Sequence, residues 1–463
     1  MTGIPQRRVP GVRQGRLQSS EVRDPEVVDL VQQLIRNACV NDGTDESGHE
    51  AANADLLRSG LEGSGCDLES YEPLPGRVSL VARMEGSDPA APSLCYLGHT
   101  DVVPVNPDTW SRDPFGGDLV DGEVWGRGAV DMLNITASMA VAFKRLARSG
   151  FRPRGTLILA AVADEEALGA HGAGWLSEHA ASSVGADYVI TEEGGVPIET
   201  PGGRRLPITV GEKGSCWCRL RVRGTAGHAS APLRTDNALV TAAAVVGRLA
   251  ALKPAARVHD AWRRFVDGMA FPADLAAMLV DPAAIDGLCE SFPDVGLARQ
   301  AHALTHMTIA PTVVHGGTKL NVIPDQVEVD LDVRTLPGQT EADVRSLLAE
   351  AIGDLGDKVE ILWAHNDPAS ESPIGTPLWD ELDAIVKRFH PGAESVPFFS
   401  AGATDGRFLR RRGAVAYGFG MFSDRISFGQ FLSMFHGDDE RVDVESLALS
   451  AEMFEALPRS FLA

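Results

Sequence analysis

Short apolar runs alternate with helical patterns in the first half of the chain, and this alternation constrains the fold more than any other feature. The apolar runs occupy residues 93–98, 156–163 and 188–191, and helical patterns cover about 133–148 and 172–180. Continuous apolar strands separated by helices are typical of a parallel or mixed sheet with helices on both faces. The sequence therefore predicts an α/β layer here.

The pattern changes after about residue 213, which indicates a second structural unit. An alanine-rich helix at 237–252 and a poorly patterned helical region at 254–305 lie between strands at 217–222 and 326–334. In 326–334 apolar and charged residues alternate, as in a strand with one face in water. Another apolar strand, at 414–419, resembles the first region, so the second unit is predicted to be inserted into the first.

These patterns predict the fold class, α/β, with two domains. The main domain is expected to comprise residues 1–213 and 367–463 and to contain a central mixed, mostly parallel sheet flanked by helices. Residues 214–366 are expected to form an inserted α+β domain. A chain of 463 residues fits two domains, since a domain averages roughly 100–200 residues.

Composition excludes several classes of protein. The chain has 42 Lys+Arg and 64 Asp+Glu, a net charge of −22, and nucleic-acid binders need a basic face. No run approaches the roughly 18 apolar residues of a membrane span. Six scattered cysteines predict neither a disulfide scaffold nor a zinc finger, so we expect a cytoplasmic protein. The arginine-bearing residues 1–20 lack a following apolar run and predict a loose terminus.

Residues of the metal-ligand type stand at the ends of the apolar strands, where open α/β sheets place their sites. His99 and Asp101 follow the first strand, Asp164-Glu165-Glu166 follow the second, and Glu192-Glu193 follow the third. Each motif alone has an ordinary alternative, such as a surface pair or a solvated acidic turn.

Two further residues of this type are Asp131, which would otherwise be a helix N-cap, and His436. Together the strand-end residues offer two imidazoles and three carboxylates, a ligand set that suits Zn²⁺ and is compatible with Co²⁺ or Mn²⁺. Five such side chains can hold two metal ions if one carboxylate bridges them.

The motifs in combination resemble those of the M20 family of metallopeptidases and amidohydrolases, which includes aminoacylases, carboxypeptidases, dipeptidases and desuccinylases. The resemblance extends from about residue 25 to the C-terminus, and the motifs follow the order of the family. They are Gly98-His99-Thr100-Asp101-Val102-Val103-Pro104, Gly126-Arg127-Gly128-Ala129-Val130-Asp131-Met132, Asp164-Glu165-Glu166, Gly224-Thr225-Ala226-Gly227-His228-Ala229-Ser230-Ala231-Pro232, Asn321-Val322-Ile323-Pro324-Asp325, Asp332-Val333-Arg334 and His436.

The resemblance implies a role for each metal-site residue. His99 and Glu192 would hold one metal ion, Glu166 and His436 would hold the other, and Asp131 would bridge the two. Asp101 would support His99 from behind. Glu165 would act as the general base that takes a proton from the attacking water and later delivers it to the leaving amine.

The resemblance also implies roles for residues of the inserted domain, which would be a lid and a dimerisation domain. His228 would stabilise the oxyanion, either after lid closure or from a partner subunit. Asn321 and Arg334 would hold the carboxylate or carbonyl of the substrate, and Thr404 would lie in a substrate-binding loop at 402–405, with Arg407 as a further candidate. Without the family pattern, Arg334 would be expected only to pair with Asp332 or Asp330, and His228 would be expected to be an inert surface residue.

Three further details concern the residues around Asp131 and the two glutamates after the third strand. In many relatives the residues Met-Lys-Gly follow the bridging Asp, whereas here Met132-Leu133-Asn134 follow Asp131. We prefer Glu192 to Glu193 as the third carboxylate ligand, because Gly194-Gly195 then follow at the spacing of the family. The resemblance further implies a cis peptide bond after Asp131.

The sequence thus predicts a two-zinc hydrolase that cleaves the amide bond of an N-acyl amino acid or a short peptide with a free carboxylate. A dipeptidase or carboxypeptidase of the same family is the first alternative. A metal-poor relative that only binds its ligand is the second, and the intact ligand set and Glu165 count against it. Small molecules, and a second copy bound through the lid, are the expected partners; nucleic acid and membranes are not.

Overall fold

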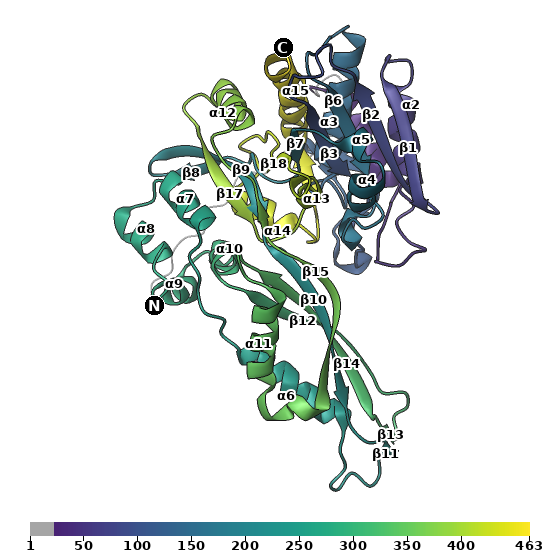
Figure 1. The fold of residues 1–463 in the computed structure, drawn as a ribbon, viewed down its shortest axis with the longest axis vertical. Helices are drawn as coiled ribbons and strands as arrows, with labels where there is room; N and C mark the ends of the chain where they lie inside the picture. Colours follow the sequence, from purple (N-terminus) through teal and green to yellow (C-terminus); the bar gives the residue numbers. More distant parts are fainter. Residues whose placement is uncertain (1–22) are drawn as a thin grey trace, which may run out of the picture.

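The computed structural model describes residues 23–463, so the predicted loose terminus lies outside the described residues. A ten-stranded sheet forms the upper body in Figure 1, with the order β1-β2-β6-β3-β7-β18-β9-β16, and β8 and β17 also pair with β9. The strands are β1 (Asp67–Leu74), β2 (Arg77–Met84), β3 (Leu94–His99), β6 (Leu157–Val162), β7 (Tyr188–Thr191), β8 (Ile198–Thr200), β9 (Gly203–Glu212), β16 (Ser370–Glu371), β17 (Glu394–Ser400) and β18 (Val415–Gly418).

The middle strands of this sheet, β6-β3-β7-β18, run parallel, and β9 and β17 are also parallel. The pairs β1–β2, β2–β6, β18–β9, β9–β16 and β8–β9 are antiparallel. Every residue of β3 and β6 is buried, because helices cover both faces of the sheet. The predicted mixed sheet flanked by helices is confirmed, with parallel pairing concentrated in its middle.

Helices pack on both faces of the ten-stranded sheet. One face carries the larger core, in which helix residues such as Phe143 and Phe454 pack against Tyr96 of β3 and its neighbours. The helices of this face are α1 (Pro25–Arg36), α2 (Ala51–Leu61), α3 (Leu133–Arg148), α12 (Pro377–Phe389) and α15 (Val444–Phe461). The opposite face carries α4 (Ala173–His179), α5 (Ala181–Val184) and α13 (Gly406–Arg410).

A four-stranded antiparallel sheet with the order β12-β14-β10-β15 forms the lower body (Figure 1). Its strands are β10 (Gly214–Arg223), β12 (Thr308–Gly316), β14 (Gln326–Thr335) and β15 (Val359–Asp367). One face packs against α6 (Ala238–Ala251) and α11 (Glu341–Ile352), and the other carries partly exposed ion pairs such as Arg219 with Asp330. The alternation in β14 therefore has the predicted cause, one buried face and one wet face.

The poorly patterned region contains four short helices: α7 (Asp260–Gly268), α8 (Ala273–Leu279), α9 (Ile285–Ser291) and α10 (Val295–Thr305). Their apolar side chains, among them Trp262 and Phe265, pack against Val396, Phe398 and Phe399 of β17. These helices therefore lie against the ten-stranded sheet, although residues 260–305 belong to the predicted inserted domain.

The chain passes from the ten-stranded sheet to the four-stranded sheet at Lys213 and returns between Asp367 and Ser370. The division into a main and an inserted domain at 213/214 and 366/367 stays a prediction. The remaining elements are β4 (Asp118–Val120), β5 (Glu123–Trp125) and β19 (Arg441–Asp443), which form a small sheet, β11 (Gly227–His228) with β13 (Val322–Ile323), α14 (Phe428–Met434), and the 3₁₀ turns η2 (Pro107–Thr109), η3 (Glu165–Ala167) and η4 (Gly353–Lys358).

Two expectations from composition can be compared with the structure. All six cysteines lie within residues 23–463 and are free. In the same part of the chain, no helix has the length and apolar character that crossing a membrane requires.

Candidate metal centre

The middle strands of the ten-stranded sheet bring the predicted metal-site residues together. His99 is the last residue of β3, Glu165 and Glu166 begin η3 after β6, and Glu192 follows β7 directly. Because β6, β3 and β7 run parallel, these residues emerge at the same edge of the sheet. His436 reaches the same place from the segment after α14.

Asp131 lies between the two imidazoles. Its Oδ1 is 3.1 Å from His99 Nε2, and its Oδ2 is 3.3 Å from His436 Nε2. Glu166 Oε2 lies 3.1 Å from His436 Nε2, and Glu192 Oε2 lies 3.7 Å from His99 Nε2. Each oxygen of Asp131 thus faces a different histidine. A second carboxylate lies near each histidine, Glu192 near His99 and Glu166 near His436.

This donor set fits two divalent metal ions. Ligand atoms of His99, Asp131 and Glu166 lie within 4.8 Å of one another, as do those of His99, Glu165 and Glu192. Glu166 Oε1 is buried and has no hydrogen-bond partner among residues 23–463. Imidazole and carboxylate donors at these separations match the ligands that Zn²⁺ takes in proteins. The residues present can therefore hold the metal ions that the sequence predicts.

The buried carboxylates have strongly shifted acidities. Burial raises the pKa of Glu165 to about 6, and burial together with the charge of Asp131 raises the pKa of Glu166 to about 8. Burial would also raise the pKa of Asp131, but hydrogen bonds with His436 and His99 outweigh it and hold this pKa well below its usual value. The contacts with Asp131 and Glu166 raise the pKa of His436 to about 11. A divalent cation bound here would favour the ionised carboxylates and the neutral imidazoles.

Asp101 connects His99 to the loop that carries the two glutamates. The Nδ1 of His99 lies 3.0 Å from the backbone oxygen of Asp101, a contact that leaves Nε2 facing the cluster. The Asp101 carboxylate accepts hydrogen bonds from the backbone N–H groups of Glu165 and Glu166, at 3.2 and 3.1 Å. Asn41 donates to the same carboxylate at 2.8 Å. Asp101 therefore positions both the imidazole and the η3 turn.

Glu440 is a supporting residue that sequence reasoning missed. Its buried carboxylate accepts hydrogen bonds from the backbone N–H groups of Val130 and Asp131, at 2.6 and 3.0 Å, and from Arg127 Nη1 at 2.9 Å. It therefore fixes the loop that presents Asp131. The peptide bond between Asp131 and Met132 is cis, as the resemblance implies.

The two adjacent glutamates after β7 point to different partners. Glu192 faces His99, whereas Glu193 Oε1 accepts a hydrogen bond from Ser400 Oγ at 2.9 Å. Burial raises the pKa of Glu193 to about 7. The geometry thus favours Glu192 as the ligand, which agrees with the preference from the sequence.

A cavity of about 660 Å³ opens over the cluster and is walled by both sheets. Asp131, Glu165 and His436 line one side, and Trp217 and Arg334 line the other. The sequence analysis did not single out Trp217, because an aromatic residue in a strand is ordinary.

Two arginines line this cleft. The Arg334 guanidinium pairs with Asp332, at 2.7 and 3.0 Å, and donates to Ser215 Oγ at 2.7 Å. Arg407 is buried, donates to Asp367 at 3.0 Å, and places Nη1 3.8 Å from Glu165 Oε1. The pairing of Arg334 with Asp332 that the sequence suggested is therefore present, in a side chain that also faces the cleft.

Three predicted site residues neither line this cleft nor contact the cluster around Asp131. His228 and Asn321 lie at β11 and beside β13, at the far tip of the lower body in Figure 1. Thr404 is buried, and its hydroxyl donates to Glu212 Oε2 at 2.8 Å, while Gly402 and Ala403 line the cleft. Within one chain, the described structure does not bring His228 and Asn321 to the cluster.

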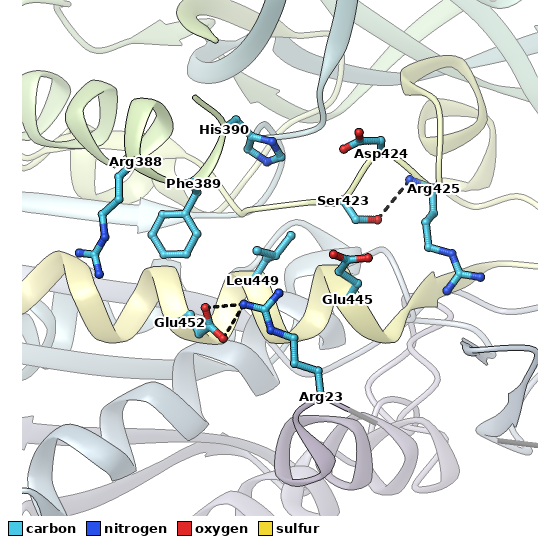
Figure 2. A pocket seen from close by; sticks show the side chains of 10 residues that line it. All are labelled: Arg23, Arg388, Phe389, His390, Ser423, Asp424, Arg425, Glu445, Leu449 and Glu452. Atoms are coloured by element: carbon cyan, nitrogen blue, oxygen red, sulfur yellow. Dashed lines mark hydrogen bonds and ion pairs between the residues drawn. The ribbon is translucent and has the colours of Figure 1, made fainter. Parts of the chain in front are cut away.

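The other large polar cavity, of about 670 Å³, shares no lining residue with the cleft. Figure 2 shows its charged side chains, such as Arg23, whose guanidinium donates to Glu452 at 2.8 Å. None of its lining residues belongs to the cluster around Asp131. The cleft over Asp131 is therefore the candidate active site.

Comparison with known proteins relates the chain to a large set of enzymes. A family model, Peptidase family M20/M25/M40, matches residues 95–460. The succinyl-diaminopimelate desuccinylase of Stenotrophomonas maltophilia (strain K279a) is 28% identical over 446 residues, which cover 94% of this chain and 99% of that protein. The human N-fatty-acyl-amino acid synthase/hydrolase PM20D1 is 28% identical over 376 residues, which cover 78% of this chain and 73% of the human protein.

Among solved structures, the M20 family metallo-carboxypeptidase Sso-CP2 from Sulfolobus solfataricus superposes with a TM-score of 0.71 at 18% sequence identity. The match covers 95% of this chain and 99% of that chain. The similarity in structure therefore includes both sheets and the connections between them.

Proposed function

Because the chain belongs to peptidase family M20/M25/M40 and is a metal-dependent hydrolase of amide bonds, we propose that its substrate is an N-acyl amino acid or a short peptide with a free carboxylate. One observation carries this proposal: the same cleft is lined by Asp131, Glu166 and His436 of the cluster and by Arg334 of the four-stranded sheet. A guanidinium recognises a carboxylate through paired hydrogen bonds. Two relatives, the desuccinylase and PM20D1, are named for acylated amino acid substrates.

We assign the metal ligands as the sequence predicts, with zinc as the native metal. His99 and Glu192 would hold one ion, Glu166 and His436 would hold the second, and Asp131 would contribute one oxygen to each. Support comes from the short contacts of the two Asp131 oxygens with different imidazoles. When bound, the two ions would polarise the scissile carbonyl and lower the pKa of the attacking water.

Glu165 acts as the general base in this proposal. Its carboxylate lies beside the donors of His99 and Glu192 and lines the cleft. Burial raises its pKa to about 6, so that it can take a proton from the attacking water and give it to the leaving nitrogen near neutral pH. Arg407, 3.8 Å away, holds the carboxylate in place.

His228 is proposed to donate a hydrogen bond to the oxyanion. The backbone N–H of Ser230 donates to His228 Nδ1 at 3.2 Å, so the neutral ring carries its proton on Nε2. The ring is therefore prepared to donate from Nε2. Since His228 lies far from the cluster of its own chain, we propose that it serves the active site of a second copy.

An edge strand and exposed apolar side chains of the lid offer a contact surface for a dimer. β12 is an edge strand of the four-stranded sheet, and its Val313 and Val314 are exposed. Leu239 and Val240 of α6 are also exposed. Unpaired strand edges and exposed apolar side chains are typical of surfaces that a partner covers.

Complementation between inactive chains tests the contribution of His228. His228→Ala alone is expected to lower kcat about 10²–10³-fold with unchanged metal content, because an oxyanion donor is lost. Mixing equal amounts of His228→Ala and Glu165→Gln chains should restore about a quarter of wild-type activity, since half of randomly formed dimers are hybrids with one intact site. Hybrid dimers without activity would place His228 outside the partner's site, and unchanged kcat in the single variant would remove it from the mechanism.

Substitution of Arg334 tests carboxylate recognition. Arg334→Met is expected to raise KM about 10–100-fold, with a smaller change in kcat, because a hydrogen bond to a charged group contributes about 1.5–3 kcal/mol. Arg345→Met is the matched control, since Arg345 also lies over a tryptophan ring of the same sheet but is exposed and outside the cleft. Equal KM values for Arg334→Met and wild type would contradict the assignment.

A panel of N-acetyl, N-succinyl and long-chain N-acyl amino acids, together with dipeptides, tests the substrate class. Each is incubated with Zn²⁺-, Co²⁺- or Mn²⁺-loaded protein, and release of free amine is measured. We expect the largest kcat/KM for an N-acyl amino acid with Zn²⁺. Cleavage of dipeptides alone would favour the alternative, a dipeptidase or carboxypeptidase.

A further inference from the structure

Asp286, His302 and His306 form a second cluster of metal-ligand side chains, which we call the α9–α10 cluster. Asp286 lies on α9, His302 lies on α10, and His306 follows the last residue of α10. One ligand atom from each lies within 4.8 Å of the other two. The two imidazole rings are stacked, with centroids 4.1 Å apart and planes 6° from parallel. The stacking places both rings together at the C-terminal end of α10.

The hydrogen bonds of His306 determine which ring nitrogen is free. Nδ1 lies 2.9 Å from the backbone oxygen of His302 and 3.0 Å from Thr305 Oγ1. The Thr305 hydroxyl itself donates to the backbone oxygen of Ala301 at 2.7 Å, so both neighbours of Nδ1 can accept its proton. In the neutral ring Nε2 then carries a lone pair, as in histidines that bind metals.

A carboxylate oxygen lies close to Nε2 without accepting a hydrogen bond from it. His306 is 1% exposed, and its Nε2 makes no hydrogen bond with any residue in 23–463, although Asp286 Oδ1 lies 2.8 Å away. A buried nitrogen without a hydrogen-bond partner is costly. A cation bound by both atoms would satisfy the nitrogen.

We propose that Asp286, His302 and His306 bind a divalent transition-metal ion, with Zn²⁺ as the best match, independently of the metal ions in the cleft. Two imidazoles and one carboxylate are a common set of three protein ligands for Zn²⁺. Asp286 and His302 also line a hollow of about 510 Å³, which leaves a coordination position open to water. None of the three residues lines the catalytic cleft.

The ion would stabilise the junction between the two sheets. Lys213, at the crossing from β9 to β10, donates to the backbone oxygens of Ala303 and His306, each at 2.8 Å. A metal ion that joins α9 to the end of α10 would therefore hold the helical segment against this crossing. Because the ion binds only the folded chain, Zn²⁺ should raise the Tm.

Metal content tests the proposal in the full-length protein. Each protein is saturated with Zn²⁺, freed of excess metal, and analysed by emission spectroscopy. His302→Ala and Asp286→Asn are each expected to hold one Zn²⁺ fewer than wild type and to keep wild-type turnover. His315→Ala is the matched control, an exposed histidine 3.8 Å from Asp330, and should hold as much zinc as wild type. Wild-type zinc content in both cluster variants would overturn the proposal.

Thermal unfolding with added Zn²⁺ provides a second measurement. Asp286 is half exposed, so Asp286→Asn should fold and show the wild-type Tm in the presence of a chelator. The affinity of Asp286→Asn for zinc at this site should fall at least about 100-fold, since loss of a hydrogen bond to a metal ligand alone lowers metal affinity about 10–100-fold. A wild-type rise of Tm with Zn²⁺ in Asp286→Asn would refute the site. Turnover reports on the proposed function separately, because these variants leave the cleft intact.

Discussion

Asp131→Ala is expected to release both metal ions from the cleft and to abolish most of the activity. The two oxygens of the Asp131 side chain face two different imidazoles, at 3.1 and 3.3 Å. Loss of a hydrogen bond that supports a metal ligand already lowers the affinity for the metal about 10–100-fold. Removal of a ligand shared by both ions should therefore lower activity at least about 1,000-fold at fixed zinc concentration.

Metal content distinguishes this prediction from a general loss of structure. Asp131→Ala should retain at most the ion at the α9–α10 cluster, and adding His302→Ala should remove that ion as well. Asp438→Ala, an exposed aspartate two residues after His436, is the control and should keep all metal and activity. Two tightly bound ions in the cleft of Asp131→Ala would refute the bridging assignment.

The strand-end residues could be predicted because their strands are locally determined. β3 and β6 are buried along their whole length, so both read as continuous apolar runs in the sequence. Parallel pairing then brings His99 and Glu166 to one edge of the sheet without further information. The local sequence therefore predicts that these two residues meet at one edge, whereas their roles as ligands are implied by the family motifs.

Asp101 could be predicted as a support of the cluster, but the contacts of Glu440 and Arg407 could not, because their partners are distant in sequence. Glu440 accepts hydrogen bonds from Val130 and Asp131, which lie more than 300 residues earlier. The Arg407 guanidinium contacts both Asp367 and Glu165, and these two acids lie on opposite sides of the inserted segment in the sequence. No local periodicity encodes such pairs, and a lone acid or arginine usually lies on the surface.

Helices α7–α10 illustrate a second reason why part of the fold could not be predicted from the sequence. They are 7 to 11 residues long, too short for a 3.6-residue period to be clear. The surface on which they pack comes from β17, which follows about 90 residues after α10. Their placement against the ten-stranded sheet, and with it the α9–α10 cluster, therefore depends on tertiary packing.

Glu165→Gln is expected to keep the metal ions and lose about 10²–10⁴-fold in kcat, the usual contribution of a general base. The amide has the size of the carboxylate and can still accept hydrogen bonds, but it cannot take a proton from water. Affinity for the product amino acid should change little, because the proposed contact with the product carboxylate is Arg334.

The pH dependence of kcat/KM gives an independent check on the same residue. Burial raises the pKa of Glu165 to about 6, and a base must be unprotonated to act. Activity should therefore rise with pH through this region in wild type, as the carboxylate loses its proton. In Glu165→Gln the residual activity should lack this rise, because no group titrates at that position. A variant with wild-type metal content and near-normal kcat would remove Glu165 from the proton-transfer step. It would leave Glu193, another glutamate that lines the cleft and is not an assigned ligand, as the group to test next.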